Sequence, residues 1–263
     1  MSTKCTIAQL QTRVFAEKEK NLSLLREKAR EAKARGAGIV CAGEMFCCPY
    51  ETPLFPVYAE EDGGPVFRAL SGIAAENKVI LQPGTVPERD PEGRIYNTAY
   101  VFGPDGTLLA KHRKVHLFDV DIEGGQYFRE SDTLTAGSGA TVFDTPFGRA
   151  GVCVCFDIRF PALAAEMAAA GVKIVFVPAA FNMTTGPAHW QLLFRARAVD
   201  SQCFYAGTSP ARDPEASYTA YGHSILTDPW GNVLSEMDGA EGMRITEIDL
   251  SEADRVRRQI PLL

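Results

Sequence analysis

The sequence lacks the features that would place the protein in a membrane or on nucleic acid. No apolar run approaches the roughly 20 residues that a membrane-spanning helix needs. Basic residues are not in excess, because 27 Lys and Arg stand against 33 Asp and Glu and give a formal net charge of −6. This balance argues against nucleic acid or an anionic membrane as the main partner. A secretory apolar segment is also missing at the N-terminus, so we expect a cytoplasmic protein.

The seven cysteines cannot all pair with one another, because their number is odd. In a cytoplasmic protein the default is reduced thiols, most of them buried as small apolar side chains. Cys41, Cys153 and Cys203 lie within apolar runs and fit this expectation. Cys47 and Cys48 fall in a loop, where they can be exposed. The sequence leaves one question open, namely whether one thiol carries out chemistry.

Strands alternate with helices along the chain, which indicates an α/β fold. The apolar patterns predict strands at residues 6–10, 38–42 and 79–82 and helices at residues 16–35 and 65–77. Further helices are predicted at residues 161–170 and 187–200. Because 263 residues can form one large α/β domain, we treat residues 1–263 as a single domain.

A weak internal repeat relates the two halves of the chain. Tyr96, Pro104, Gly106 and Leu109 recur 125 residues later, as Tyr221, Pro229, Gly231 and Leu234. Two related halves, at about residues 1–135 and 140–263, would each form a mixed sheet with helices on one face. Stacking the bare faces of the two sheets predicts a four-layer αββα sandwich of pseudo-symmetric halves.

Three reactive side chains follow predicted buried strands, where sites in α/β sheets usually form. Glu44 follows residues 39–43, Lys114 follows a hairpin strand, and Cys155 follows residues 150–154. Cys155 is the best candidate for a nucleophile. It stands at a tight passage into the helix at residues 161–170, and we expect the positive end of that helix to favour the thiolate.

Two other site chemistries are weighed against this one. A Cys–His arrangement remains open, although none of His112, His116, His189 and His223 has a link to Cys155 that the sequence makes visible. A nucleotide-binding loop is disfavoured, because residues 137–139, Gly-Ser-Gly, lack a third glycine and do not open a helix.

Three segments of the chain resemble the signature blocks of the nitrilase superfamily of carbon–nitrogen hydrolases. These are residues 43–46, 111–118 and 151–161, which contain Glu44, Lys114 and Cys155. Residues 119–122, 181–190, 195–200 and 209–213 look characteristic of its omega-amidase branch. The resemblance covers essentially the whole chain, and the family fold is an αββα sandwich.

The resemblance implies a Glu–Lys–Cys triad that works without metal or cofactor. Glu44 would act as general base, Cys155 would attack the amide carbonyl to form a thioester, and Lys114 would stabilise the oxyanion with the backbone N–H of Phe156. A second glutamate of the family matches Glu130 and would orient the lysine or the substrate amide. Without the resemblance, Glu130 would be read as a solvated loop carboxylate.

The resemblance also implies a small-molecule amide substrate, namely the terminal amide of a dicarboxylate monoamide such as 2-oxoglutaramate or 2-oxosuccinamate. Arg159 is the candidate for binding the distal carboxylate, since a guanidinium binds carboxylates bidentately; its bland alternative is a salt bridge to Asp157. Phe181 and Thr185 would supply an apolar wall and a hydroxyl, and Tyr50 would cap the pocket. The alternative is another amidase of the superfamily, for an N-carbamoyl compound or an amide like deaminated glutathione.

The resemblance further implies a homodimer. Relatives of this branch generally continue beyond the segment that matches residues 257–261, and such tails often pack across a dimer interface. The form of the interface in this protein is therefore left open.

Overall fold

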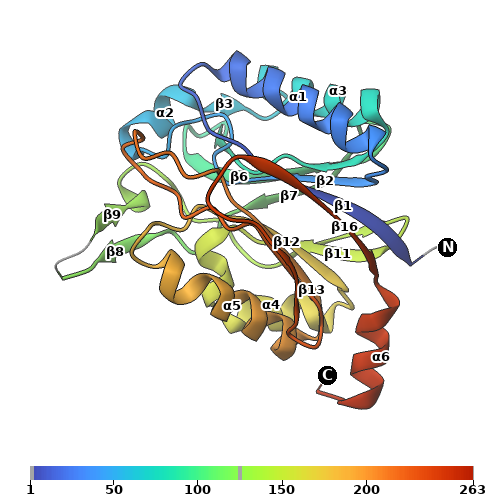
Figure 1. Ribbon diagram of the computed structural model, residues 1–263. Helices are drawn as coiled ribbons and strands as arrows, with labels where there is room; N and C mark the ends of the chain where they lie inside the picture. Colours follow the sequence, from blue (N-terminus) through green and yellow to red (C-terminus); the bar gives the residue numbers. More distant parts are fainter. Residues whose placement is uncertain (1–2, 124–125, 263) are drawn as a thin grey trace.

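The computed structural model describes residues 3–123 and 126–262. In these residues two mixed sheets pack face to face, and helices cover their outer faces (Figure 1). The predicted αββα sandwich is confirmed. The 263-residue chain as one domain stays an interpretation, supported by a core to which both sheets contribute.

The first sheet has eight strands in the order β16-β1-β2-β4-β6-β5-β3, and β7 also pairs with β6. Their bounds are β1 Lys4–Gln11, β2 Ile39–Ala42, β3 Glu60–Glu61, β4 Ile80–Gln82, β5 Val86–Arg89, β6 Ile95–Phe102, β7 Leu108–Arg113 and β16 Gly242–Asp249. β16 comes from the end of the chain and runs antiparallel to β1. The two halves are therefore not separate, because the second half donates an edge strand to the sheet of the first.

The second sheet has six strands in the order β10-β11-β12-β13-β14-β15. Their bounds are β10 Thr141–Thr145, β11 Gly148–Val152, β12 Ile174–Pro178, β13 Phe204–Thr208, β14 Ile225–Thr227 and β15 Val233–Glu236. A short hairpin of β8, Asp119–Asp121, and β9, Tyr127–Arg129, projects beyond the sandwich at one end (Figure 1). The Pro-x-Gly hairpins at Pro104 and Pro229 both form, between β6 and β7 and between β14 and β15.

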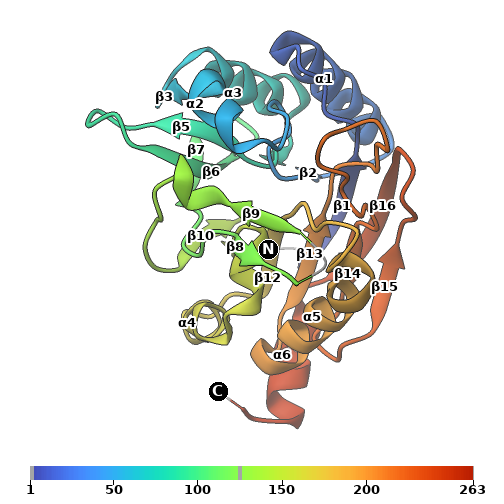
Figure 2. The same cartoon turned by 90° about the vertical axis from the view of Figure 1, so that its left-hand side faces the viewer.

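Two helices cover each sheet, and their bounds match the apolar patterns closely. α1 Lys18–Ala34 and α3 Pro65–Asn77 lie on the first sheet, and α4 Pro161–Ala169 and α5 Gly186–Ser201 lie on the second (Figures 1 and 2). α2 Phe55–Tyr58 lies beside α3, and α6 Ser251–Gln259 ends the chain. Proline at the first helical position starts α3 and α4, where its missing N–H costs nothing.

The alternation of side chains in β2 shows how the layers are held together. Ile39 and Cys41 point into the core between the sheets, whereas Val40 and Ala42 point toward α1 and α3. Both faces of the strand are buried, as parallel strands between two layers require. The parallel strands β2 and β11 deliver their carboxyl ends to the same end of the sandwich, and the candidate site lies there.

Candidate active site

Close backbone packing shapes the turn that carries Glu44. A Cβ atom on Gly84, whose φ is +87°, would lie 1.8 Å from the carbonyl oxygen of Gly43. Only glycine fits at this contact. Thr85 then fixes the turn, because its Oγ1 accepts a hydrogen bond of 2.8 Å from the backbone N–H of Met45. Met45 itself has a φ of 52°, a costly conformation for a non-glycine residue.

The carboxylate of Glu44 is fully buried and its hydrogen bonds come from four sides. Oε1 accepts from Lys114 Nζ at 2.9 Å, Asn97 Nδ2 at 2.8 Å and the Tyr50 hydroxyl at 3.1 Å. Oε2 accepts from the backbone N–H of Ala180 at 2.9 Å. Burial raises the pKa of Glu44, the Lys114 charge opposes that shift, and the Glu130 charge adds to it. The side chain is thus held in one position and has a raised affinity for a proton.

Lys114 lies between two carboxylates in the interior. Its Nζ is 2.9 Å from Glu44 Oε1 and 2.9 Å from Glu130 Oε2. Burial alone would lower the pKa of Lys114, but the charges of Glu130 and Glu44 outweigh it and raise that pKa above its usual value. Lys114 is therefore a permanent positive charge and not a proton donor at neutral pH.

Glu130 is a buried member of this cluster and not a solvated loop carboxylate. It accepts hydrogen bonds from the Phe118 backbone N–H at 2.6 Å and from the Tyr50 hydroxyl at 2.7 Å. Tyr50 is buried too and reaches both glutamates. It is thus a structural partner of the carboxylates as well as a wall of the site.

Cys155 begins a short 3₁₀ helix, Cys155–Arg159, immediately after β11 and the residues that follow it. Its φ of 46° is strained for a non-glycine residue, which is typical of an elbow that presents a side chain for chemistry. The expected thiolate is wrong for the free protein. Burial and the neighbouring Glu44 raise the pKa of the thiol well above its usual value, although Lys114 lowers it in part. The resting group is a thiol that hydrogen-bonds to Glu44.

A narrow pocket beside Cys155 brings together most of the residues predicted to bind substrate. It is lined by Phe118, Cys155, Phe156, Arg159, Ala180, Phe181, Thr185 and Tyr218. Its free volume is about 10 Å³, so the walls nearly touch. Tyr50 lies next to it, with its ring centroid 4.6 Å from that of Tyr218.

Arg159 is held in this pocket by weak partners. Its guanidinium lies over the rings of Phe181 and Phe156, at 4.9 and 5.5 Å, and Nη1 is 3.2 Å from His189 Nδ1. Within the described part of the chain no carboxylate pairs with it, and its Nε is buried without a hydrogen-bond partner. The salt bridge to Asp157 is absent there. Burial lowers the pKa of Arg159, so an anion in the pocket would relieve an unpaired charge.

Thr185 faces the same pocket, but its hydroxyl is already engaged. Oγ1 donates a hydrogen bond of 2.9 Å to Asn182 Oδ1, which also accepts from the Thr185 backbone N–H at 2.7 Å. Its oxygen can therefore accept a hydrogen bond from a ligand but does not have a free proton to donate.

Asp157 is a buried residue whose place sequence reasoning missed. It accepts from His112 Nε2 at 3.1 Å, His116 Nδ1 at 2.8 Å and the backbone N–H of Val154 at 3.0 Å. The backbone N–H of His116 adds a fourth bond, at 2.8 Å. This network ties the segment after Lys114 to the elbow before Cys155. Two of the four histidines are therefore structural, and neither serves Cys155 as a base.

Asn97 is a second missed residue. It lies on β6, donates to Glu44, and its carbonyl accepts the backbone N–H of Lys114 at 2.8 Å. The signal in the sequence was a polar residue within a wholly buried strand. Such a residue needs a partner inside the protein.

All seven cysteines are free and buried. The suggestion that Cys47 and Cys48 can be exposed is wrong, because their exposed fractions are 1% and 0%. Among the described residues, no group of His, Cys, Asp and Glu is arranged to hold a metal ion. In the same residues, no helix combines the length and apolarity that crossing a membrane would take.

A buried, hydrogen-bonded Glu–Lys–Cys cluster at one end of an αββα sandwich defines a class of thiol hydrolase. The family model for carbon–nitrogen hydrolases matches residues 4–258. The chain belongs to this family, within the nitrilase superfamily.

Similar proteins place the chain in the omega-amidase branch of that family. It is 48% identical to mouse Omega-amidase NIT2 over 98% of this chain and 93% of the relative. It is 46% identical to the human Omega-amidase NIT2 over 99% of this chain and 94% of the relative. The crystal structure of Saccharomyces cerevisiae Nit3, a member of branch 10 of the nitrilase superfamily, superposes with a TM-score of 0.90 at 38% identity, covering 98% of this chain and 95% of that one.

Proposed function

We propose that the protein is an omega-amidase that releases ammonia from the terminal amide of small dicarboxylate monoamides, with 2-oxoglutaramate and 2-oxosuccinamate as the candidate substrates. The observation that carries this proposal is Arg159, a buried cation without a carboxylate partner among the described residues, in the pocket that Cys155 lines. A guanidinium so placed would bind the distal carboxylate while the amide reaches the thiol. The relatives named omega-amidase support the same reading.

In the acylation half of the reaction, Glu44 takes the proton of the Cys155 thiol as the sulfur attacks the amide carbonyl. The raised pKa of Glu44 suits this transfer, because it brings the base closer in strength to the thiol. The developing oxyanion is stabilised by the fixed charge of Lys114 and by the backbone N–H of Phe156. Glu44 then returns the proton to the nitrogen, the C–N bond breaks, and ammonia and a thioester are formed.

In the second half, water replaces ammonia beside Glu44. The carboxylate removes a proton from water, the oxygen attacks the thioester carbonyl, and the C–S bond breaks. The proton returns to sulfur, which restores the buried thiol. The cycle consumes one water and needs neither metal nor organic cofactor.

The remaining residues position these groups. Glu130 and Tyr50 hold Lys114 and Glu44, through hydrogen bonds of 2.7–3.1 Å. Phe181 supplies an apolar wall and supports the Arg159 guanidinium. Thr185 would accept a hydrogen bond from the substrate through its oxygen.

A panel of amides, read by ammonia release, tests this function. We expect 2-oxoglutaramate and 2-oxosuccinamate to turn over much faster than simple aliphatic amides, N-carbamoyl compounds or a deaminated-glutathione-like amide. If the oxo-amides are no better than aliphatic amides of the same length, the omega-amidase assignment fails. Faster turnover of the N-carbamoyl or peptide-like amides would favour the alternative amidase.

The proposal includes a cytoplasmic homodimer, as the family resemblance implies. Light scattering of the purified protein would measure its mass against the 28.6 kDa of one chain. A mass of one chain at micromolar concentration would contradict the dimer.

A further inference from the structure

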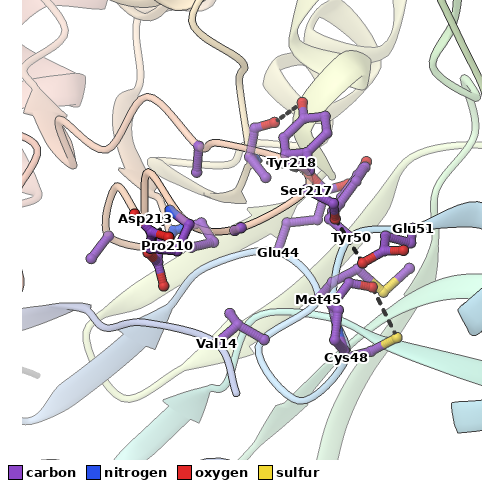
Figure 3. A pocket seen from close by; sticks show the side chains of 16 residues that line it. Val14, Glu44, Met45, Cys48, Tyr50, Glu51, Pro210, Asp213, Ser217 and Tyr218 are labelled. Carbon is purple, nitrogen blue, oxygen red and sulfur yellow. Dashed lines mark hydrogen bonds between the residues drawn. The ribbon is translucent and has the colours of Figure 1, made fainter. Parts of the chain in front are cut away.

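A second cavity lies next to the narrow pocket and is much larger. Its volume is about 280 Å³, and it is lined by Glu44 but not by Cys155. The narrow pocket is lined by Cys155 but not by Glu44. Ala180 and Tyr218 line both, so these two residues form the partition between them. Figure 3 shows Tyr50, Ser217 and Tyr218 on one side of the larger cavity and Pro210 and Asp213 on the other.

This division matches the two ends of the bond that the proposed reaction breaks, and the inference rests on that proposed function. The carbonyl carbon must lie at Cys155, which attacks it. The nitrogen must lie at Glu44, which protonates it. The acyl part therefore belongs to the narrow pocket with Arg159, and the amine belongs to the side of the larger cavity.

The charges of the two cavities differ in the same sense. Arg159 lines the acyl side. Glu51, Asp213 and Glu215 line the larger cavity, and the described residues around it include no Lys, Arg or His. Arg13 lies only at a distance of 3.9 Å from Asp213, at the surface. A carboxylate product is thus attracted to one side and an ammonium ion to the other.

Free space also favours two routes. The acyl pocket holds about 10 Å³, so an acyl group bound there leaves no path for a leaving molecule. The larger cavity has room for ammonia, for water and for a small amine. Ammonia can leave through it while the thioester stays in place.

We propose that the cavity beside Glu44 is the amine subsite of the enzyme, through which ammonia leaves and through which small amines reach the thioester. A primary amine there attacks the thioester carbonyl with its lone pair, and the C–S bond breaks. Glu44 removes a proton from the attacking nitrogen and passes it to the Cys155 sulfur. The products are a substituted amide and the free thiol, with no other reactant.

The experiment measures how the thioester divides between water and an added amine. The enzyme is supplied with an amide that it turns over, together with hydroxylamine, which is neutral, or ethylenediamine, which carries a positive charge near neutral pH. Acid and substituted amide are quantified by mass spectrometry. Ala216→Trp places a bulky ring at an exposed position of the cavity wall. Ala165→Trp, at an exposed position of α4 outside both cavities, is the matched control.

We expect Ala216→Trp to lower the ratio of substituted amide to acid at least fivefold for both amines, with the KM of the amide substrate within twofold of wild type. The paired change Asp213→Asn and Glu215→Gln should lower the ratio for ethylenediamine about fivefold and leave that for hydroxylamine nearly unchanged, since loss of nearby charge acts on the cation. Ala165→Trp should alter neither ratio.

An unchanged ratio in Ala216→Trp, in protein whose thermal unfolding matches wild type, would overturn the inference. A tenfold rise in KM with an unchanged ratio would also overturn it, because the cavity would then hold the acyl part. If the tryptophan variant does not fold, the paired charge variant decides the matter. Failure of the oxo-amides as substrates overturns the proposed function alone, since the ratio is measured equally well with a neutral amide.

Discussion

Replacing Arg159 should remove the preference for substrates with a distal carboxylate and spare the chemistry. The guanidinium already uses Nη1 toward His189, whereas its buried Nε has no partner. The edge formed by Nε and Nη2 is therefore available for a bidentate contact with a carboxylate. Methionine at this position would fill similar space between Phe156 and Phe181 without the charge or the donors.

The magnitude follows from the two hydrogen bonds. Each charge-assisted bond contributes about 1.5 kcal/mol at the low end of the measured range, so Arg159→Met should lose about 3 kcal/mol, or roughly a hundredfold in kcat/KM. Arg159→Lys keeps the charge but loses the fork, so we expect a loss of about tenfold. The kcat/KM of a neutral aliphatic amide should change less than threefold in both variants.

Ammonia release from 2-oxoglutaramate and from a neutral amide of equal length, measured in parallel, provides the assay. Arg26→Lys, a change at an exposed ion pair with Glu76 on α1, serves as the control and should leave both rates unchanged. Equal losses on the charged and neutral substrates would refute the reasoning. They would mean that Arg159 supports the elbow at Cys155 and does not read the carboxylate.

Three further outcomes follow from the same contacts. Tyr50→Phe removes one hydroxyl from two buried carboxylates and should lower kcat about tenfold with little change in KM; an unchanged kcat in steady-state assays would contradict this. The pKa of Glu44 is raised by burial, and the base must be ionised, so kcat/KM should rise with pH through an acid limb above the ordinary value of 4.5; a limb at or below 4.5 would contradict it. Asp157→Asn turns an acceptor of two imidazole contacts partly into a donor and should cost about 3 kcal/mol of unfolding free energy, lowering Tm by roughly 6–12 °C; calorimetry that finds Tm within 2 °C, where about 2 °C is the least that 1 kcal/mol produces, would show that the network is dispensable.

The strand ends of the fold were predictable from sequence because local rules control them. Glu44, Lys114 and Cys155 each follow a buried strand, and the structure brings the three together as the parallel strands require. The bounds of α3 agree with prediction to the residue, since Pro65 marks its start.

Other features depended on contacts between distant segments. Asn97 and Asp157 are single polar residues whose partners come from other strands, so no local pattern points to them. Glu130 could be found only through the family resemblance, because its burial arises from the fold around it. The thiolate expected at Cys155 failed because burial raises the thiol pKa more than Lys114 lowers it. The positions of Cys47 and Cys48 were misjudged because the loop that holds them packs beneath the site.

The central claim is that Cys155 carries the acyl group, and trapping that group tests it most directly. The enzyme is mixed with 2-oxoglutaramate, quenched in acid within the first turnover, digested and analysed by mass spectrometry. We predict that the peptide containing Cys155 gains the mass of the acyl group, that none of the other six cysteines does, and that Cys155→Ala gives neither adduct nor ammonia. Ammonia release by Cys155→Ala, or an acyl group on another residue, would contradict the account.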